Sequence, residues 1–135
     1  MAGYSKRSLA NKLGLKAGQT LYFANPPENY KATLGDLPAD INQLDHLDGP
    51  LDFIQFFSKS RAELEAEFSG LKQALASDGM LWISWPKKAS KVKTDLDENI
   101  VREIGLQNGL VDVKVCAVDD VWSGLKFVYR VKDRG

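Results

Sequence analysis

The residues best suited to chemistry are lysines in the stretch ISWPKKASKVKTDL, residues 83–96. Lys87, Lys88, Lys91 and Lys93 lie within seven residues, directly after an apolar run and a proline. Lysine ammonium groups bind phosphate and carboxylate groups as compact point charges. The stretch is therefore a candidate binding loop for an anion, and the alternative is a solvated connection without a ligand.

The elements that must position this loop follow from the pattern of apolar residues. Short, continuously apolar runs are typical of strands that are covered on both faces of a sheet. Three such strands are predicted, at 20–24, 51–57 and 80–85, with a short edge strand near 40–45. Helices are predicted at 5–13, 26–34, 61–76 and 95–108, with N-caps at Ser5, Asn25, Ser60 and Thr94.

Two longer segments at the end of the chain, 110–118 and 124–131, alternate apolar with polar residues. A period of two is typical of an antiparallel strand pair with one wetter face. Before this pair, strands alternate with helices, which favours a parallel sheet with right-handed crossovers. The sequence therefore predicts an α/β fold, mostly parallel, with an antiparallel pair of strands at the C-terminus.

Length and charge limit the possible classes of protein. The 135 residues suit one domain, 1–135, in which 1–16 form an N-terminal helical extension. The net charge is zero, so electrostatic binding must come from a local patch. No long apolar segment precedes the first strand, and we expect a cytoplasmic protein without a membrane span.

The order of these elements resembles the class I methyltransferase fold. The segment GLKQALASDGMLWISW is similar to a late helix, glycine turn and fifth strand of those enzymes. The closing helix and GLVDVKVCAVDDVWSGLKFVYR resemble their final helix and antiparallel strands. The resemblance covers about 17–131, with one helix–strand unit missing from the middle. It implies a Rossmann-like three-layer sandwich.

A second resemblance is more local. The blocks SWPKKAS and VKVCAVDDVWSGLKFV are similar to a domain family of unknown function found in small bacterial proteins. This resemblance implies a bacterial protein and names no activity.

The turn after the first strand departs from the methyltransferase pattern. A backbone that approaches S-adenosylmethionine closely needs glycines, whereas this turn reads Asn25-Pro26-Pro27-Glu28. An acidic residue is expected after the second strand to hold the cofactor ribose, and the candidates are Asp45 and Asp48. The sequence therefore predicts no cofactor in the usual pose, with an atypical S-adenosylmethionine-dependent methyltransferase as the alternative.

The stretch NPPENY also resembles the NPPY-type motif of amino-group methyltransferases. Two residues intervene before Tyr30, and the stretch follows the first strand rather than a later one. We therefore favour the interpretation of Asn25 as a helix cap.

In an open α/β sheet, ligands bind beyond the carboxyl ends of the strands. Helix starts near Ser60 and Thr94 are expected to add positive charge there. Trp85 could stack on a base, or could belong to the core. The predicted ligand-binding residues are Asn25, Lys59, Trp85, Lys87, Lys88, Lys91 and Lys93.

These residues favour a small binding or regulatory module over an enzyme. Its ligand would be an anionic small molecule, a nucleotide or an anionic partner, held by the loop 86–94. Nucleic acid is a less favoured anion because the net charge is zero. A protein partner is a third hypothesis, bound by the edge strand 110–118 or by Trp122.

Other candidates have simpler structural explanations. Cys116 is interpreted as a structural thiol, because no histidine adjoins it. His46 lies in a loop with two aspartates, and we favour solvation over a metal site. Asp119 and Asp120 are typical of a hairpin turn, although a carboxylate pair could also act in acid–base chemistry.

Overall fold

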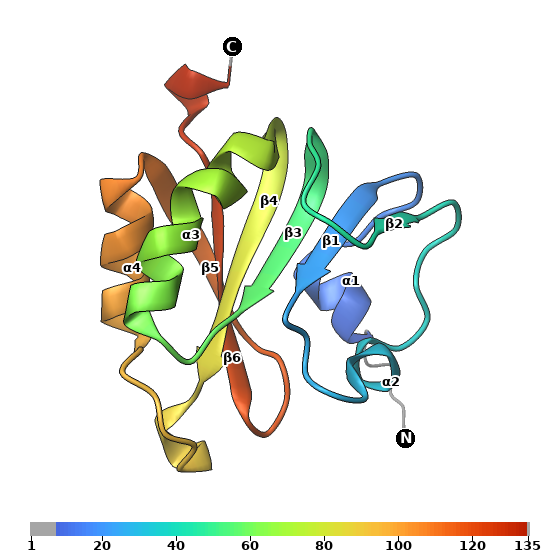
Figure 1. Ribbon diagram of the computed structural model, residues 1–135. Helices are drawn as coiled ribbons and strands as arrows, with labels where there is room; N and C mark the ends of the chain where they lie inside the picture. Colours follow the sequence, from blue (N-terminus) through green and yellow to red (C-terminus); the bar gives the residue numbers. More distant parts are fainter. Residues whose placement is uncertain (1–7, 135) are drawn as a thin grey trace.

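Six strands form one sheet in the order β2-β1-β3-β4-β6-β5 (Figure 1). The computed structural model describes residues 8–134. Strands β1 to β4 pair in parallel, whereas β6 is antiparallel to both β4 and β5. The strands are β1 (Thr20–Ala24), β2 (Asn42–Leu44), β3 (Leu51–Phe57), β4 (Leu75–Pro86), β5 (Leu110–Ala117) and β6 (Trp122–Tyr129). The predicted sheet, with its short edge strand and its antiparallel C-terminal pair, is confirmed.

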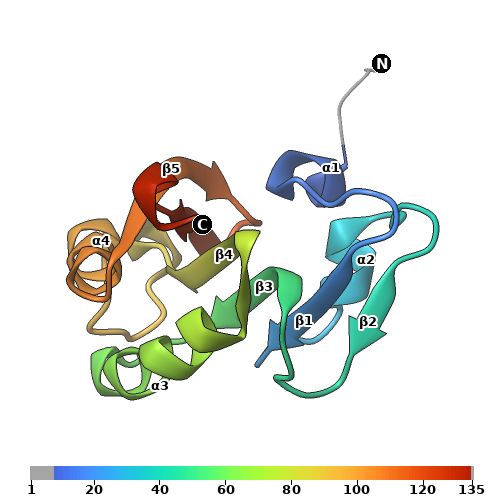
Figure 2. The ribbon, with the colours of Figure 1, turned by 90° about the horizontal axis from the view of Figure 1, so that it is seen from above.

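Helices cover both faces of the sheet, which gives the three layers of a Rossmann-like sandwich (Figure 2). The longer helices lie on one face and two short helices lie on the other. The helices are α1 (Leu9–Leu13), α2 (Tyr30–Leu34), α3 (Arg61–Ala74) and α4 (Glu98–Gln107), with short 3-10 turns at Lys88–Ser90 and Val131–Asp133. None of the helices within residues 8–134 combines the length and apolarity needed to cross a bilayer.

Each face of the sheet has its own core. On the first face, Leu64, Phe68 and Leu71 of α3 are buried against the sheet, as their spacing predicts. On the opposite face, Trp82 is fully buried, and its indole Nε1 donates a hydrogen bond to the carbonyl of Leu13 at 2.9 Å. That bond fixes the end of α1 to the middle of the sheet.

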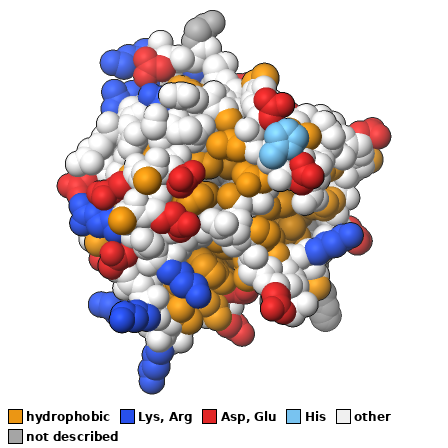
Figure 3. All heavy atoms as spheres, in the orientation of Figure 1, with side chains coloured by type: hydrophobic (Ala, Val, Ile, Leu, Met, Phe, Trp, Pro, Cys, Tyr) orange, Lys and Arg blue, Asp and Glu red, His pale blue; other side chains and the backbone are white. Residues whose placement is uncertain are grey.

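The first face is less well covered over β1. A hollow of about 240 Å³ lies there beside α3 and is lined by Tyr22, Ala24, Asn25, Leu47, Phe56, Glu63, Glu67 and Leu71. Figure 3 shows apolar side chains gathered on this face of the molecule.

Two predicted helix starts are wrong. Helix α2 begins at Tyr30 rather than at 26, because Asn25 and Asn29 have φ angles of 56° and 65°, which a helix does not allow. The Asn25 side chain does not cap the helix; its Nδ2 donates to the carbonyl of Phe57 at 3.3 Å. Helix α4 is capped by Asp97, whose Oδ1 accepts from the amide of Ile100 at 2.8 Å.

The first helix is shorter than predicted within the described residues. Ser8 caps α1 by accepting a hydrogen bond from the Asn11 amide, and Gly14 ends the helix with a φ of 93°. Ser5, the expected cap, lies outside the described residues. Ala10, Leu13 and Leu15 are buried, so this segment forms part of one helical layer.

Candidate functional site

The loops that follow β1, β3 and β4 meet the β5–β6 hairpin at the carboxyl edge of the sheet. They surround a hollow of about 500 Å³ lined by Asn25, Pro27, Phe57, Ser58, Lys59, Ser60, Glu63, Val92, Val121 and Trp122. Asn25 and Lys59, both predicted ligand-binding residues, therefore lie on one site. The proline pair and the lysine loop approach the same rim, because Pro27 and Val92 line the same hollow.

Three of the four loop lysines, Lys88, Lys91 and Lys93, line a neighbouring hollow instead. This second hollow has a volume of about 450 Å³ and is lined by Trp85, Pro86, Lys88, Lys91, Val92, Lys93, Thr94, Asp95, Leu96 and Asp97. Val92 lines both hollows and forms the wall between them. Lys87 lines neither; its backbone amide donates to the carbonyl of Val121 at 2.8 Å and ties the loop to the hairpin.

The lysine loop has a defined conformation. Ser90 Oγ donates to the carbonyl of Lys87 at 2.7 Å and accepts from the amide of Val92 at 3.2 Å. Lys91 follows in the left-handed region, with a φ of 62°. The side chains of Lys88, Lys91 and Lys93 are exposed, and no ion pair between described residues includes a lysine. The backbone therefore fixes where these three lysines leave the loop, and their ammonium groups form no ion pair with a described residue.

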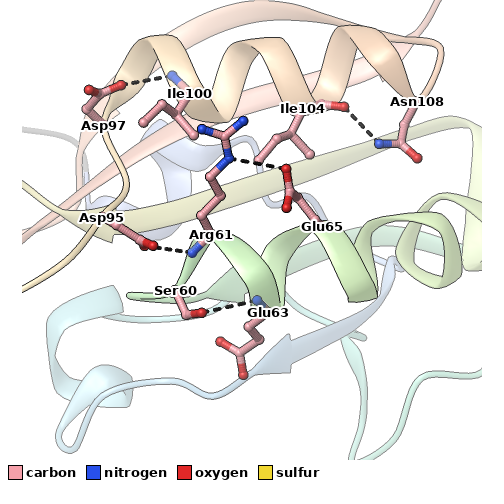
Figure 4. Close-up of polar contacts among 9 residues, drawn as sticks. All are labelled: Ser60, Arg61, Glu63, Glu65, Asp95, Asp97, Ile100, Ile104 and Asn108. Carbon is pink, nitrogen blue, oxygen red and sulfur yellow. Dashed lines mark hydrogen bonds and ion pairs between the residues drawn. The ribbon is translucent and has the colours of Figure 1, made fainter.

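The positive ends of the helices do not contribute as predicted. The amide of Arg61 in the first turn of α3 donates to Asp95 Oδ1 at 2.7 Å, and Ser60 Oγ accepts from the amide of Glu63 (Figure 4). Asp97 occupies the N-terminus of α4 in the same way (Figure 4). Side chains of the protein therefore already accept from amides in the first turn of both helices, and Asp95 and Asp97 are among the residues that line the lysine hollow. Any positive potential in that hollow must come from the lysines.

The contact between Asp95 and α3 also joins the lysine loop to the rest of the site. Thr94 Oγ1 donates to the carbonyl of Lys59 at 2.7 Å, and Asp95 binds the next helix start. Replacing Asp95 with alanine should lower the free energy of unfolding by about 0.5–2 kcal/mol, the cost of losing a helix cap. Urea denaturation measures this, and hydrogen exchange should show faster opening of residues 86–97. An Asp95→Asn control keeps an acceptor oxygen and should lose less; equal losses in both variants would contradict this role.

Trp85 is 4% exposed and belongs to the core beneath α3 and α4. Trp85 is among the residues that line the lysine hollow, but a buried ring is not a free stacking platform, which favours the core interpretation. Trp122 is also packed, with its ring centroid 5.2 Å from that of Phe57 and 9% of its surface exposed. An aromatic anchor that protrudes towards a partner is thus not found at either position.

Asp119 and Asp45 each accept hydrogen bonds from nearby groups of the protein. Asp119 Oδ1 accepts from the amides of Val121 and Trp122 at 2.8 and 2.7 Å, which supports the hairpin-turn interpretation. His46 Nδ1 lies 2.7 Å from Asp45 Oδ1, and this hydrogen bond raises the pKa of His46 and lowers that of Asp45. No group of three or more His, Cys, Asp or Glu side chains in the described part of the chain could hold a metal ion.

The position of Asp45 is the main feature that bears on a cofactor. Strand β2 ends at Leu44, so Asp45 is the first residue beyond the carboxyl end of the strand next to β1. A third hollow, of about 670 Å³, is lined by Tyr22, Phe23, Pro26, Pro27, Tyr30, Lys31, Leu34, Leu37, Gln43, Leu44 and Asp45. The acidic residue and the first turn therefore share one hollow, although the turn itself is closed by two prolines.

Sequence reasoning missed a buried polar chain beneath the edge. Tyr30 Oη donates to Gln55 Oε1, and Gln55 Nε2 donates to Ser84 Oγ at 3.0 Å. Gln55 and Ser84 are fully buried. Burial raises the pKa of Tyr30 well above its ordinary value, so the phenol stays protonated and donates. Two single polar residues inside apolar strands, in LDFIQFF and MLWISW, are the signal that could have revealed it.

Comparison with solved structures agrees with this geometry. The magnesium protoporphyrin IX methyltransferase of Synechocystis PCC 6803, with bound SAH, matches with a TM-score of 0.58 and 14% identity, over 90% of this chain and 78% of that one. A TehB-like SAM-dependent methyltransferase from Corynebacterium glutamicum gives 0.57 and 12%, over 90% and 85%. A precorrin-6y C5,15-methyltransferase from Geobacter metallireducens gives 0.59 and 9%, over 90% and 86%.

This chain has a methyltransferase-like fold. At these identities the likeness shows the fold alone. The sequence matches no protein-family model and no curated protein. The resemblance to a bacterial domain family of unknown function therefore stays a prediction.

Proposed function

We propose that this methyltransferase-like domain is a small binding or regulatory module that holds an anionic ligand at the carboxyl edge of its sheet. The observation that carries the proposal is the arrangement of Lys88, Lys91 and Lys93 around one hollow. These lysines are exposed, and none forms an ion pair with a described residue. The first turn, which has two prolines and no glycine, supports the absence of S-adenosylmethionine in the usual pose.

The two hollows suggest how such a ligand would lie. Its phosphate or carboxylate group would meet the lysines, and its remainder would pass Val92 towards Asn25 and Lys59. Asp95 and Asp97 line the same hollow, but their Oδ1 atoms already accept hydrogen bonds from the amides of Arg61 and Ile100, so the anionic group would lie on the lysine side. A nucleotide or a phosphorylated metabolite, with charge at one end only, fits these surroundings better than a uniformly charged polymer.

The proposal is tested by reversing two charges. The Lys88→Glu/Lys91→Glu variant should lose roughly 10- to 100-fold in affinity for nucleotides or sugar phosphates, because two attractive contacts become repulsive. A thermal-shift screen followed by calorimetry measures this. The melting temperature without ligand should stay nearly unchanged, since both side chains are exposed and unpaired. Lys132→Glu, an exposed lysine beyond β6, is the matched control and should bind as the unmodified protein does.

Two outcomes would count against the proposal. The first is that the unmodified protein binds no anion in the screen, and the second is that the double variant binds as well as the control.

Binding of nucleic acid is a separate outcome: contacts from all four loop lysines would give a slope of log affinity against log salt of about −3.6. As part of the same proposal, the SWPKKAS resemblance supports a bacterial source, and the N-terminal sequence, which has no long apolar segment, supports a cytoplasmic setting.

The second candidate function is that of an atypical S-adenosylmethionine-dependent methyltransferase. Asp45 directly follows β2, in the place where a ribose-binding carboxylate is expected from the resemblance. Asn25 adopts a left-handed φ of 56°, a conformation that glycine usually supplies. The similar magnesium protoporphyrin IX methyltransferase has been solved both with bound SAH and with bound SAM. This candidate would use the hollow at Asp45 rather than the lysines.

A further inference from the structure

A second group of lysines lies on the opposite face of the sheet, away from α3 and α4. Lys114 of β5 and Lys126 of β6 are direct partners in the register of the antiparallel pair. The Nζ of Lys114 donates to the carbonyl of Lys12 in α1 at 3.3 Å, so this side chain reaches α1. Lys16 comes two residues after Gly14, which lies against the side chain of Met80 in β4, and the charge of Lys16 acts on Lys126. The three lysines are therefore neighbours on one face of the sheet.

This convergence has an electrostatic cost in the free protein. Like charges directly opposite each other in an antiparallel pair are destabilising. Burial, together with the charges of Lys114 and Lys16, lowers the pKa of Lys126. None of the ion pairs within residues 8–134 includes any of these lysines. The repulsion is therefore not relieved by a salt bridge inside the described part of the chain.

The surroundings of Lys126 supply a cavity and a further cation. A hollow of about 180 Å³ on this face is lined by Asp78, Gly79, Met80, Lys126, Val128 and Arg134. Asp78 is the acidic residue of this lining, and it forms no ion pair with Lys126 in the described structure. Lys126 and Arg134 therefore share one hollow with a single carboxylate, and Lys16 and Lys114 lie outside its lining.

We propose that Lys16, Lys114 and Lys126 form a second anion site, which binds a polyphosphate group: free pyrophosphate or the phosphate chain of a nucleotide. Compact ammonium groups suit phosphate oxygens, and several negative charges on one small group match three converging positive charges. A ligand with a single carboxylate would leave most of the repulsion between the three lysines in place. Lys126 is four residues along β6 from Trp122, which pairs with Pro86 at the base of the loop. The patch is therefore about 13 Å along the strand from the loop, and the two sites are separate.

The test measures the melting temperature in sodium pyrophosphate and in sodium chloride at matched ionic strength. Pyrophosphate should raise the melting temperature of the unmodified protein above its value in chloride, because a ligand that binds the folded state stabilises it. The Lys114→Gln/Lys126→Gln variant should lose the part of this difference that persists when the loop lysines are reversed. Without pyrophosphate it should melt at least as high as the unmodified protein, since the repulsion between opposite strands is removed.

Two further variants keep the result interpretable. Lys16→Gln changes an exposed residue outside the sheet, so it should fold normally and weaken pyrophosphate binding roughly tenfold. In Lys88→Glu/Lys91→Glu, which removes the loop site, pyrophosphate should still raise the melting temperature, and adding Lys114→Gln/Lys126→Gln to that variant should abolish the rise. Failure of the loop proposal would leave the response intact, whereas failure of this proposal would leave loop binding intact.

The shifts in melting temperature with magnesium-free ATP and with tripolyphosphate distinguish a nucleotide from a free phosphate chain as the ligand. Equal shifts would mean that the phosphate chain alone is recognised, and a larger shift with ATP would mean that the nucleoside also makes contacts. Both outcomes support the site. No stabilisation by pyrophosphate beyond chloride, or an undiminished response in both the double variant and Lys16→Gln, would overturn it.

Discussion

Replacing Trp82 with alanine should lower the free energy of unfolding by about 3–5 kcal/mol. The indole is fully buried between α1 and the sheet, so its removal leaves a cavity that the strands cannot close. The variant also loses the hydrogen bond from Nε1 to the carbonyl of Leu13. Because single domains are stable by about 5–15 kcal/mol, this one change removes a large part of the total. Urea denaturation followed by circular dichroism measures it.

Two control variants separate the parts of this effect. Trp82→Phe keeps most of the apolar volume and loses the hydrogen bond, which should cost about 1–3 kcal/mol. Val131→Ala changes an apolar residue that is 80% exposed and should alter stability by less than about 0.5 kcal/mol. A loss below about 1 kcal/mol for Trp82→Ala would mean that α1 is not anchored as described.

Replacing Gln55 with leucine should cost roughly 2–4 kcal/mol although leucine is more apolar and similar in size. The change leaves the hydroxyl of Tyr30 without its acceptor and Ser84 Oγ without its donor. Each buried polar group without a partner costs about 1–3 kcal/mol. Because Tyr30 begins α2, the loss should also loosen the turn at the carboxyl edge of the sheet. Chemical denaturation and hydrogen exchange of residues 25–34 measure the two effects.

The matched control removes the whole chain of polar groups. In Tyr30→Phe/Gln55→Leu/Ser84→Ala, no side-chain polar group of the three is left, so the variant should be more stable than Gln55→Leu alone. If the triple variant is instead less stable by the sum of three independent losses, the three residues do not act as a connected unit.

Local pattern was enough to predict the core of the fold. The spacing of Leu64, Phe68 and Leu71 identifies the buried face of α3, and continuous apolar runs identify β1, β3 and the second half of β4. These features depend on residues a few positions apart. The late start of α2 does not depend on such nearby residues. It accompanies a hydrogen bond from Asn25 to Phe57, which is 32 residues away.

The candidate site was predicted only in part for the same reason. The meeting of three loops at one edge follows from parallel topology, and Asn25 and Lys59 do share a hollow. Two other features depend on contacts between distant segments. Val92 separates the hollow at Asn25 from the hollow at the lysines, and Asp95 occupies the N-terminus of α3. The pairing of Lys114 with Lys126 depends on a register shift between Asp112 and Lys114, which strict alternation does not reveal.

The central claim is that a methyltransferase-like fold carries an anion site at its carboxyl edge in place of the usual cofactor site. Calorimetric titration of the unmodified protein with S-adenosylhomocysteine tests it most directly. The account predicts no saturable binding up to about 1 mM, which corresponds to a binding free energy weaker than about −4 kcal/mol. Micromolar binding that is lost in Asp45→Asn and kept in Lys88→Glu/Lys91→Glu would contradict it.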